Sequence, residues 1–258
     1  MRIQLIRNAT LRLSFGQQTF LIDPWFAEKG QGPCYAGQVT SPLVDLPLPL
    51  AQILDGVDAV IISHLHTDHF DDAARAALPP DIPIFCAAVF AKKITEYGFS
   101  NVKPITHTTT FGGISLSVTQ GRHGPEEILQ EMGPVSGFMF RAPDEPTLYW
   151  AGDTILCDEV REIIETVHPD VIVVHACGAV WDGIEPLVMD ADMTLETLQL
   201  SGSAKVVATH LDAVDHATVS RQDLRNAAGK WPTVFERLSI PEDGDVLVYD
   251  TLSQNKSP

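Results

Sequence analysis

Four side chains that can bind a metal ion fall within six consecutive positions of the sequence. They are His64, His66, Asp68 and His69, and they follow the apolar run 59–62, which predicts a short buried strand. The packing of a protein core gives no reason for three imidazoles and a carboxylate at this spacing. We therefore expect the chain to fold so that this window lies at a metal site.

Three more candidate ligands each follow a predicted strand elsewhere in the chain. They are His123, Asp153 and His210, after the predicted strands 114–118, 148–151 and 206–208. Side chains at strand ends converge when the strands share a sheet edge, so we expect all seven residues to meet. Five histidines and two aspartates exceed the needs of one tetrahedral ion, and they suit two divalent ions that share a carboxylate.

The other histidines carry weaker signals. His107 and His168 are expected to be ordinary polar residues. His175 ends an apolar strand. It could contact a metal ligand from outside the ligand set or belong to the core, and we favour the core. His216, Asp212 and Asp215 follow His210, so one of them could lie beside the metal ligands, but positions on a surface loop are favoured.

The order of predicted elements indicates the fold class. Short strands come first along the chain, and strands then alternate with helices predicted over 71–78, 87–97, 160–167 and 220–228. This order suits two packed sheets with helices outside them, which is an α/β (α+β) architecture. No linker divides the chain, so we expect a single domain over residues 1–258.

Charge and hydropathy exclude several partners. Lys and Arg total 17 and Asp and Glu total 34, which gives a net charge of −17 that repels nucleic acids and anionic lipids. We therefore expect a small-molecule substrate, no nucleic acid and no membrane. No apolar run of about 18 residues and no signal-peptide pattern occur, so a cytoplasmic location is expected. The oligomeric state is unspecified, and a homo-oligomer is left open.

The four cysteines give no second metal or redox motif. Cys34, Cys86, Cys157 and Cys177 are far apart, and none forms a Cys-x-x-Cys pair. Each is expected to be a small buried apolar residue.

The window 64–69 resembles the signature of the metallo-β-lactamase superfamily, and the other motifs occur in the same order between about residues 3 and 249. Residues 21–25, 8–10 and 240–245 are similar to the branch that contains L-ascorbate-6-phosphate lactonase, although this chain has Asn8 where that branch usually has histidine. The resemblance implies a four-layer αββα sandwich with the metal ions between the sheet edges.

The same resemblance implies a ligand set. His64, His66 and His123 would bind the first ion, and Asp68, His69 and His210 the second, with Asp153 bridging both. Asp23 would lie outside this set and accept a hydrogen bond from a ligand or a metal-bound water.

These residues predict a metal-dependent hydrolase. Two divalent ions, Zn²⁺ first and Mn²⁺ as the alternative, would lower the pKa of a bound water and provide hydroxide for attack on an ester-type bond, with a lactone favoured. Asp68 and Asp153 are the predicted catalytic residues, because Asp68 could pass the proton and Asp153 would hold both ions. We expect no organic cofactor.

Several alternatives stay open. The same ligands serve phosphodiesterases, iron-dependent oxygenases and metal-binding sensors without activity. A flavin-linked di-iron protein would carry Glu at the place of His66, which argues against that type. Arg122, beside His123, could pair with a substrate anion, but a surface role is favoured. The loop 27–49, with Trp25, Phe26 and Tyr35, is expected to form a lid or pocket wall.

Overall fold

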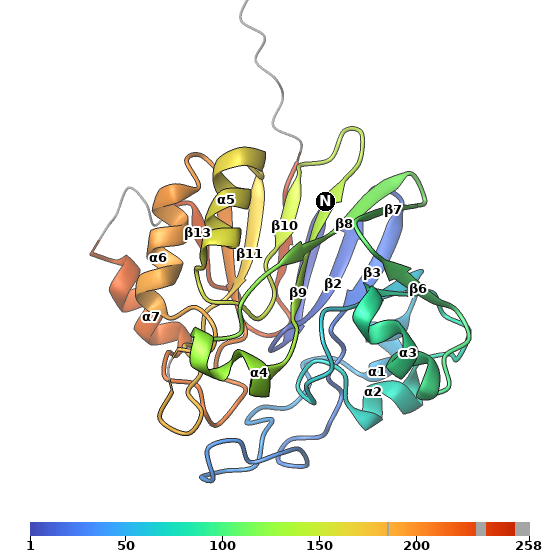
Figure 1. The fold of residues 1–258 in the computed structure, drawn as a ribbon, viewed down its shortest axis with the longest axis horizontal. Helices are drawn as coiled ribbons and strands as arrows, with labels where there is room; N and C mark the ends of the chain where they lie inside the picture. Colours follow the sequence, from blue (N-terminus) through green and yellow to red (C-terminus); the bar gives the residue numbers. More distant parts are fainter. Residues whose placement is uncertain (185, 231–235, 251–258) are drawn as a thin grey trace, which may run out of the picture.

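The computed structural model describes residues 1–184, 186–230 and 236–250, whose strands form two seven-stranded sheets (Figure 1). The first sheet has the order β14 (Val246–Val248), β1 (Arg2–Arg7), β2 (Thr10–Phe15), β3 (Gln18–Ile22), β4 (Ala59–Ile62), β5 (Ile84–Ala87) and β6 (Val102–Ile105). The second has the order β13 (Leu238–Ser239), β12 (Lys205–Thr209), β11 (Val171–His175), β10 (Leu148–Trp150), β9 (Ser136–Arg141), β8 (Ile114–Gln120) and β7 (Thr108–Phe111).

Helices cover the outer face of each sheet. Figure 1 shows one group on one side of the paired sheets, namely α1 (Leu50–Leu54), α2 (Asp72–Ala77) and α3 (Ala88–Glu96). The other group is α5 (Asp158–Val167), α6 (Ala191–Leu200) and α7 (Arg221–Ala228), while a 3₁₀ turn (Glu126–Ile128) and α4 (Leu129–Met132) lie in the loop after β8. The predicted four-layer αββα sandwich is confirmed.

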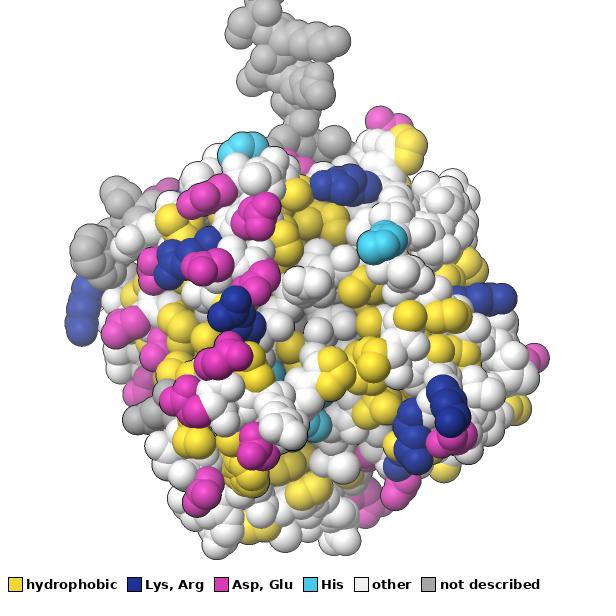
Figure 2. All heavy atoms as spheres, viewed as in Figure 1, with side chains coloured by type: hydrophobic (Ala, Val, Ile, Leu, Met, Phe, Trp, Pro, Cys, Tyr) yellow, Lys and Arg dark blue, Asp and Glu magenta, His cyan; other side chains and the backbone are white. Residues whose placement is uncertain are grey.

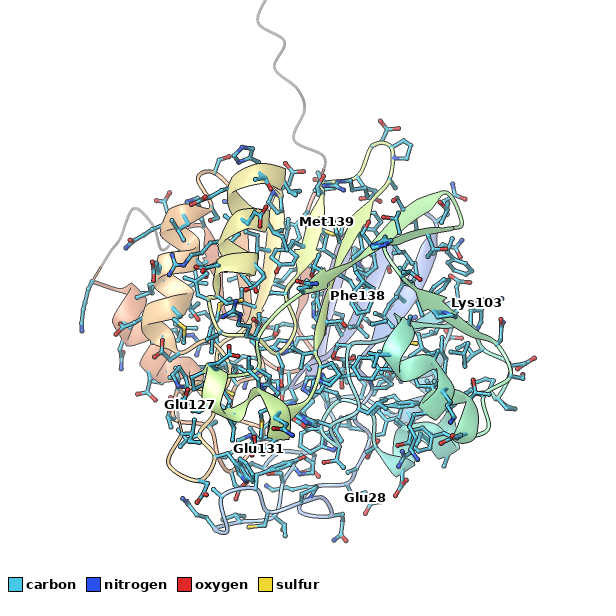
Figure 3. The ribbon with its side chains drawn as sticks, viewed as in Figure 1. Glu28, Lys103, Glu127, Glu131, Phe138 and Met139 are labelled. Carbon is cyan, nitrogen blue, oxygen red and sulfur yellow. The ribbon has the colours of Figure 1, made fainter. Side chains whose placement is uncertain are left out.

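Three apolar clusters fill the three interfaces between these layers. Phe20, Phe140 and Trp150 belong to the cluster between the sheets, and the other two clusters join each sheet to its helices. Two neighbouring residues on β9 illustrate this division (Figure 3). Phe138 belongs to the cluster between the two sheets, and Met139 belongs to a cluster between a sheet and its helices. Burial on both faces explains why β4 is a continuous apolar run without polar alternation.

The topology brings the ends of several strands to one edge. β3, β4 and β5 are parallel neighbours, as are β10, β11 and β12. The loops that follow their carboxyl ends therefore meet where the candidate ligands lie. Among the described residues, no helix has both the length and the apolar character needed to cross a bilayer.

Two elements have hydrophobic periodicity too weak to predict them from the sequence. The buried residues of α6 include Thr194 and Thr197, so its apolar period is interrupted. β7 consists of three threonines and a phenylalanine, and its alternation is correspondingly weak.

Two expectations about single residues were wrong. Cys34 is exposed, because the loop that carries it runs over the surface. Trp25 and Phe26, which were expected at a lid or pocket wall, are buried in the clusters beneath the helices.

The start of α7 provides a stability prediction. Ser220 Oγ accepts a hydrogen bond from Asp223 N at 3.1 Å, and the Asp223 carboxylate accepts one from Ser220 N at 3.0 Å. Ser220→Ala is expected to lower the free energy of unfolding by about 1 kcal/mol in urea denaturation. The control Ser203→Ala, at an exposed position outside any cap, is expected to change it by less than about 0.5 kcal/mol. Equal stabilities of the two variants would contradict this prediction.

Candidate metal centre

The structure brings all seven candidate ligands together as two adjoining clusters. The first cluster is His64, His66 and His123, whose ring nitrogens lie within 4.8 Å of one another. The second joins His69, Asp153 and His210 with His175 at the same spacing, and Asp68 lies beside it.

Two of the three imidazoles in the first cluster are held by hydrogen bonds at Nδ1. His123 Nδ1 lies 2.9 Å from Leu187 O, and His64 Nδ1 lies 2.8 Å from Ser63 Oγ, so both Nε2 atoms are left for the site. His64 Nε2 is buried and has no hydrogen-bond partner among the described residues. Burial lowers the pKa of His123 to about 4 and that of His64 well below its ordinary value. Both rings are therefore neutral near pH 7, which is the form that binds metal ions.

The second cluster combines imidazoles with buried carboxylates. Asp153 Oδ2 lies 3.2 Å from His69 Nε2, and His210 Nε2 lies 3.1 Å from Asp68 Oδ2. Burial disfavours the charged form of His69. The Asp153 and Asp68 carboxylates outweigh this effect and raise the pKa of His69 to about 10. The charge of His69 in turn holds the pKa values of both carboxyl groups well below the ordinary value, against the effect of their burial.

These residues fit divalent cations. Imidazole nitrogens and carboxylate oxygens are the ligands of zinc and related metals, and His64 supplies a buried nitrogen that makes no hydrogen bond within the described part of the chain. Without a metal ion, the Asp153 and Asp68 carboxylates raise the pKa of His69 against the effect of burial, and a bound dication would supply positive charge there instead.

Asp23 lies outside the ligand clusters, at the end of β3. Its Oδ2 accepts a hydrogen bond from His69 Nδ1 at 2.7 Å and one from Ser63 Oγ at 2.5 Å. Its Oδ1 accepts a third from Ser63 N at 2.8 Å. The side chain therefore holds His69 so that Nε2 faces the site.

The favoured placement of His175 in the core was wrong in one respect. The residue is buried, but its Nδ1 lies 2.5 Å from Asp153 Oδ1, at the site. The signal was its position at the end of an apolar strand, which is the signal that identified Asp153. Cys177 Sγ, 3.4 Å from His210 Nδ1, and Asn8 Nδ2, 3.2 Å from Asp68 Oδ2, are further contacts that the sequence did not predict.

After His210, the expected surface positions were wrong for Asp215 and His216. Asp215 has a side chain only 2% exposed, and it accepts hydrogen bonds from Tyr35 N and Ala36 N. His216 packs on the Tyr35 ring, with centroids 4.7 Å apart. Asp212 is half-buried and pairs with Arg221 at 3.1 Å.

A hollow of about 300 Å³ opens above the two clusters. Its other walls are mostly apolar or aromatic and comprise Tyr35, Leu65, Met132, Ala179, Trp181, Leu187 and Val188, together with Thr67 and His216. No Lys or Arg is among the described residues that line it. Arg122 is turned to Glu159, with nitrogen and oxygen 2.8 Å apart. In Figure 2, histidine atoms are partly visible near the centre of the face, and acidic side chains gather over α5–α7.

An outer hollow adjoins this one. It has a volume of about 760 Å³ and shares Tyr35, Trp181 and His216 with the inner hollow. Tyr35 Oη lies 2.6 Å from Thr67 Oγ1, so the tyrosine is hydrogen-bonded to the loop that carries the candidate metal ligands 64–69. Part of the expected pocket wall from loop 27–49 is thus present, through Tyr35.

Comparison with known proteins agrees with this geometry. The model of the family described as "Beta-lactamase superfamily domain" matches residues 18–211. YddR of Bacillus subtilis, a UPF0173 protein, is 40% identical over 255 residues, which cover 96% of this chain and 100% of YddR. A UPF0173 metal-dependent hydrolase of Methylobacterium nodulans is 27% identical over 67% of this chain and 72% of its own length.

Two crystal structures are similar over nearly the whole chain. The isothiocyanate hydrolase from Delia radicum gut bacteria has a TM-score of 0.92 and 33% identity, covering 97% of this chain and 100% of that one. A possible metal-dependent hydrolase from Veillonella parvula has a TM-score of 0.93 and 34% identity, covering 96% and 99%. These likenesses and the His/Asp clusters support a metal-dependent hydrolase. The chain therefore belongs to the metallo-β-lactamase superfamily and, within it, to the UPF0173 family.

Proposed function

We propose that this protein hydrolyses a small uncharged substrate at an electrophilic carbon, with an isothiocyanate as the first candidate and a lactone as the second. The observation that carries this proposal is the position of the His/Asp clusters at the floor of a mostly apolar hollow. The hollow has room for a small substrate, and its apolar walls favour an apolar substituent.

The charge around the hollow argues against anionic substrates. A phosphodiester or a phosphorylated lactone would meet no Lys or Arg among the described lining residues, and Arg122 is bound to Glu159. The net charge of −17 adds a repulsive field. An uncharged substrate avoids both costs, so the phosphodiesterase alternative is disfavoured.

Two observations favour the two candidates. The likeness to an isothiocyanate hydrolase extends over 97% of this chain at 33% identity. Hydrolysis of an isothiocyanate adds water to the carbon of N=C=S and breaks the bond from carbon to nitrogen, giving an amine and carbonyl sulfide. A lactone also offers an uncharged electrophilic carbon, and residues 21–25 resemble the lactonase-containing branch.

The chain's own residues would hold the metal ions and accept the proton from a metal-bound water. His64, His66 and His123 would bind one ion, while His69, His210 and Asp68 would bind the other, with Asp153 between them. Bound divalent ions supply Lewis acidity and lower the pKa of a bound water. Asp68 lines the hollow as an ionised carboxylate, which is the form that would bind a metal ion and take a proton from a bound water.

The test combines metal analysis with a substrate panel. Purified protein is analysed for zinc, manganese and iron, and metal-free protein is reloaded with each. Allyl isothiocyanate, a short acyl lactone and a bis-aryl phosphodiester are then supplied under each metal. We expect metal-dependent turnover of the isothiocyanate or the lactone with kcat/KM of at least about 10⁴ M⁻¹s⁻¹, and phosphodiester turnover about 100-fold lower.

Three outcomes would contradict the proposal. Faster cleavage of the phosphodiester would favour the phosphodiesterase alternative. Bound iron with oxygen consumption would favour an oxygenase. Full metal loading without turnover of any substrate would favour a metal-binding sensor.

Tyr35 provides a test of substrate size. Tyr35→Ala would join the inner and outer hollows, so kcat/KM for phenethyl isothiocyanate relative to allyl isothiocyanate is expected to rise about tenfold. The matched control Tyr35→Phe removes only the contact with Thr67 and keeps the ring on His216, so its ratio is expected to stay near that of the wild type. An unchanged ratio in Tyr35→Ala would contradict this role.

A further inference from the structure

We propose that His175 is a positioning residue, which orients the Asp153 carboxylate so that a single oxygen faces both ligand clusters. This inference rests on the proposed function only in assuming that the clusters bind metal ions. It assigns a role outside metal binding to a histidine whose proximity alone would suggest a ligand.

The distance between the two side chains argues against His175 Nδ1 as a ligand of an ion that Asp153 Oδ1 also binds. His175 Nδ1 and Asp153 Oδ1 are 2.5 Å apart. Two ligands of one tetrahedral zinc ion, each about 2.0–2.1 Å from the metal, are about 3.3 Å apart. The observed distance is too short for two ligands of one ion and fits a short hydrogen bond, with the Nδ1–H group as donor and the carboxylate oxygen as acceptor.

The surroundings of His175 fix the ring in this orientation. The residue is the last of β11, pairs with Thr209 of β12 and is fully buried. The edge-to-face contact with the Trp150 ring has centroids 5.1 Å apart. His175 Nε2 has no hydrogen-bond partner among the described residues, so Asp153 is the partner that selects the Nδ1–H tautomer.

The consequence appears at the second oxygen of Asp153. With Oδ1 bound to His175, Oδ2 faces the site and lies 3.2 Å from His69 Nε2 and 3.5 Å from His123 Nε2. These two nitrogens belong to different clusters. Oδ2 is thus the atom available to both, and rotation of the carboxylate would remove it from that position.

The experiment compares zinc binding in three variants. His175→Leu removes the donor and keeps an apolar side chain of similar size, while His175→Asn keeps an N–H donor near the position of Nδ1. His107→Leu changes an exposed histidine and is the matched control. Metal-free protein is titrated with Zn²⁺ against a chromophoric chelator, which gives the number of ions and each affinity, and X-ray absorption at zinc counts the imidazole ligands.

We expect His175→Leu to weaken the second zinc at least tenfold and to leave the first within a few-fold of the wild type. His175→Asn should retain both affinities within a few-fold, with an unchanged imidazole count. Two results would each overturn the inference: wild-type affinities in His175→Leu, or equal losses in both variants. If His175→Leu does not fold, His175→Gln replaces it, because its longer side chain moves the amide away from the Nδ1 position.

Failure of the proposed function would look different. Wild-type protein that binds zinc and hydrolyses no substrate would contradict the proposed function, and the zinc titrations would still decide the role of His175. Wild-type protein that binds no zinc would overturn both.

Discussion

The double variant His66→Ala/Asp153→Ala is expected to lose its bound metal ions and its hydrolytic turnover together. His66 belongs to the first cluster, and Asp153 lies between the first and the second. Each cluster therefore loses a ligand, and the buried imidazoles left behind lack the carboxylate that balances a cation.

The expected loss of kcat/KM follows from what the metal ions contribute to the reaction. Without them, no group lowers the pKa of water or polarises the substrate, so kcat/KM should fall at least about 10⁴-fold, to the background rate. Zinc content by mass spectrometry and turnover of the best substrate from the panel measure the two losses. His107→Ala, on the exposed segment before β7, is the control and should keep both.

Circular dichroism must accompany these measurements, because Asp153 is buried and its loss removes the hydrogen bond with His175, the ion pair with His69 and the contact with His123. A folded double variant that hydrolyses substrate at the wild-type rate would disprove a metal mechanism at this site. A double variant that keeps its metal and loses turnover would mean that His66 and Asp153 act chiefly in the chemistry and not as ligands.

The sequence predicts well those features that depend on local pattern. The apolar run of β4 followed by His64 required only a strand and its end, and both were identified. Asp153 and His210 were identified in the same way. Their convergence followed from the rule that the carboxyl ends of parallel neighbouring strands share an edge.

Features that depend on pairs of distant residues were not predicted. Asp215 accepts hydrogen bonds from Tyr35 N and Ala36 N, about 180 residues away along the chain, and nothing in either local pattern signals that contact. The contact of His175 with Asp153 depends on β10 and β11 being adjacent, which periodicity cannot establish. A buried histidine at a strand end looks the same whether its partner is a carboxylate or an apolar side chain.

Asp23→Ala is expected to have the second-largest effect, on zinc affinity and on stability. The carboxylate accepts hydrogen bonds from His69 Nδ1, Ser63 Oγ and Ser63 N, and all of these groups are buried. Its removal frees the His69 ring to rotate and should weaken zinc binding by about 10–100-fold. It also leaves buried donors without acceptors, which should lower the free energy of unfolding of the metal-free protein by about 3 kcal/mol.

The backbone at Asp23 calls for a second variant, because its φ of +44° lies in the left-handed region, where alanine is strained and asparagine is tolerated. Asp23→Asn keeps that conformation and the side-chain size, but its amide lacks the negative charge and has one acceptor oxygen. We expect it to lose less stability than Asp23→Ala and still to weaken zinc binding about tenfold.

Asp58→Ala is the control, because Asp58 accepts a hydrogen bond from Thr19 N at the opposite end of β3, in an exposed position. Chelator competition and urea denaturation measure both quantities, and wild-type zinc affinity in Asp23→Asn would mean that the geometry of the side chain, and not its charge, holds His69 in place.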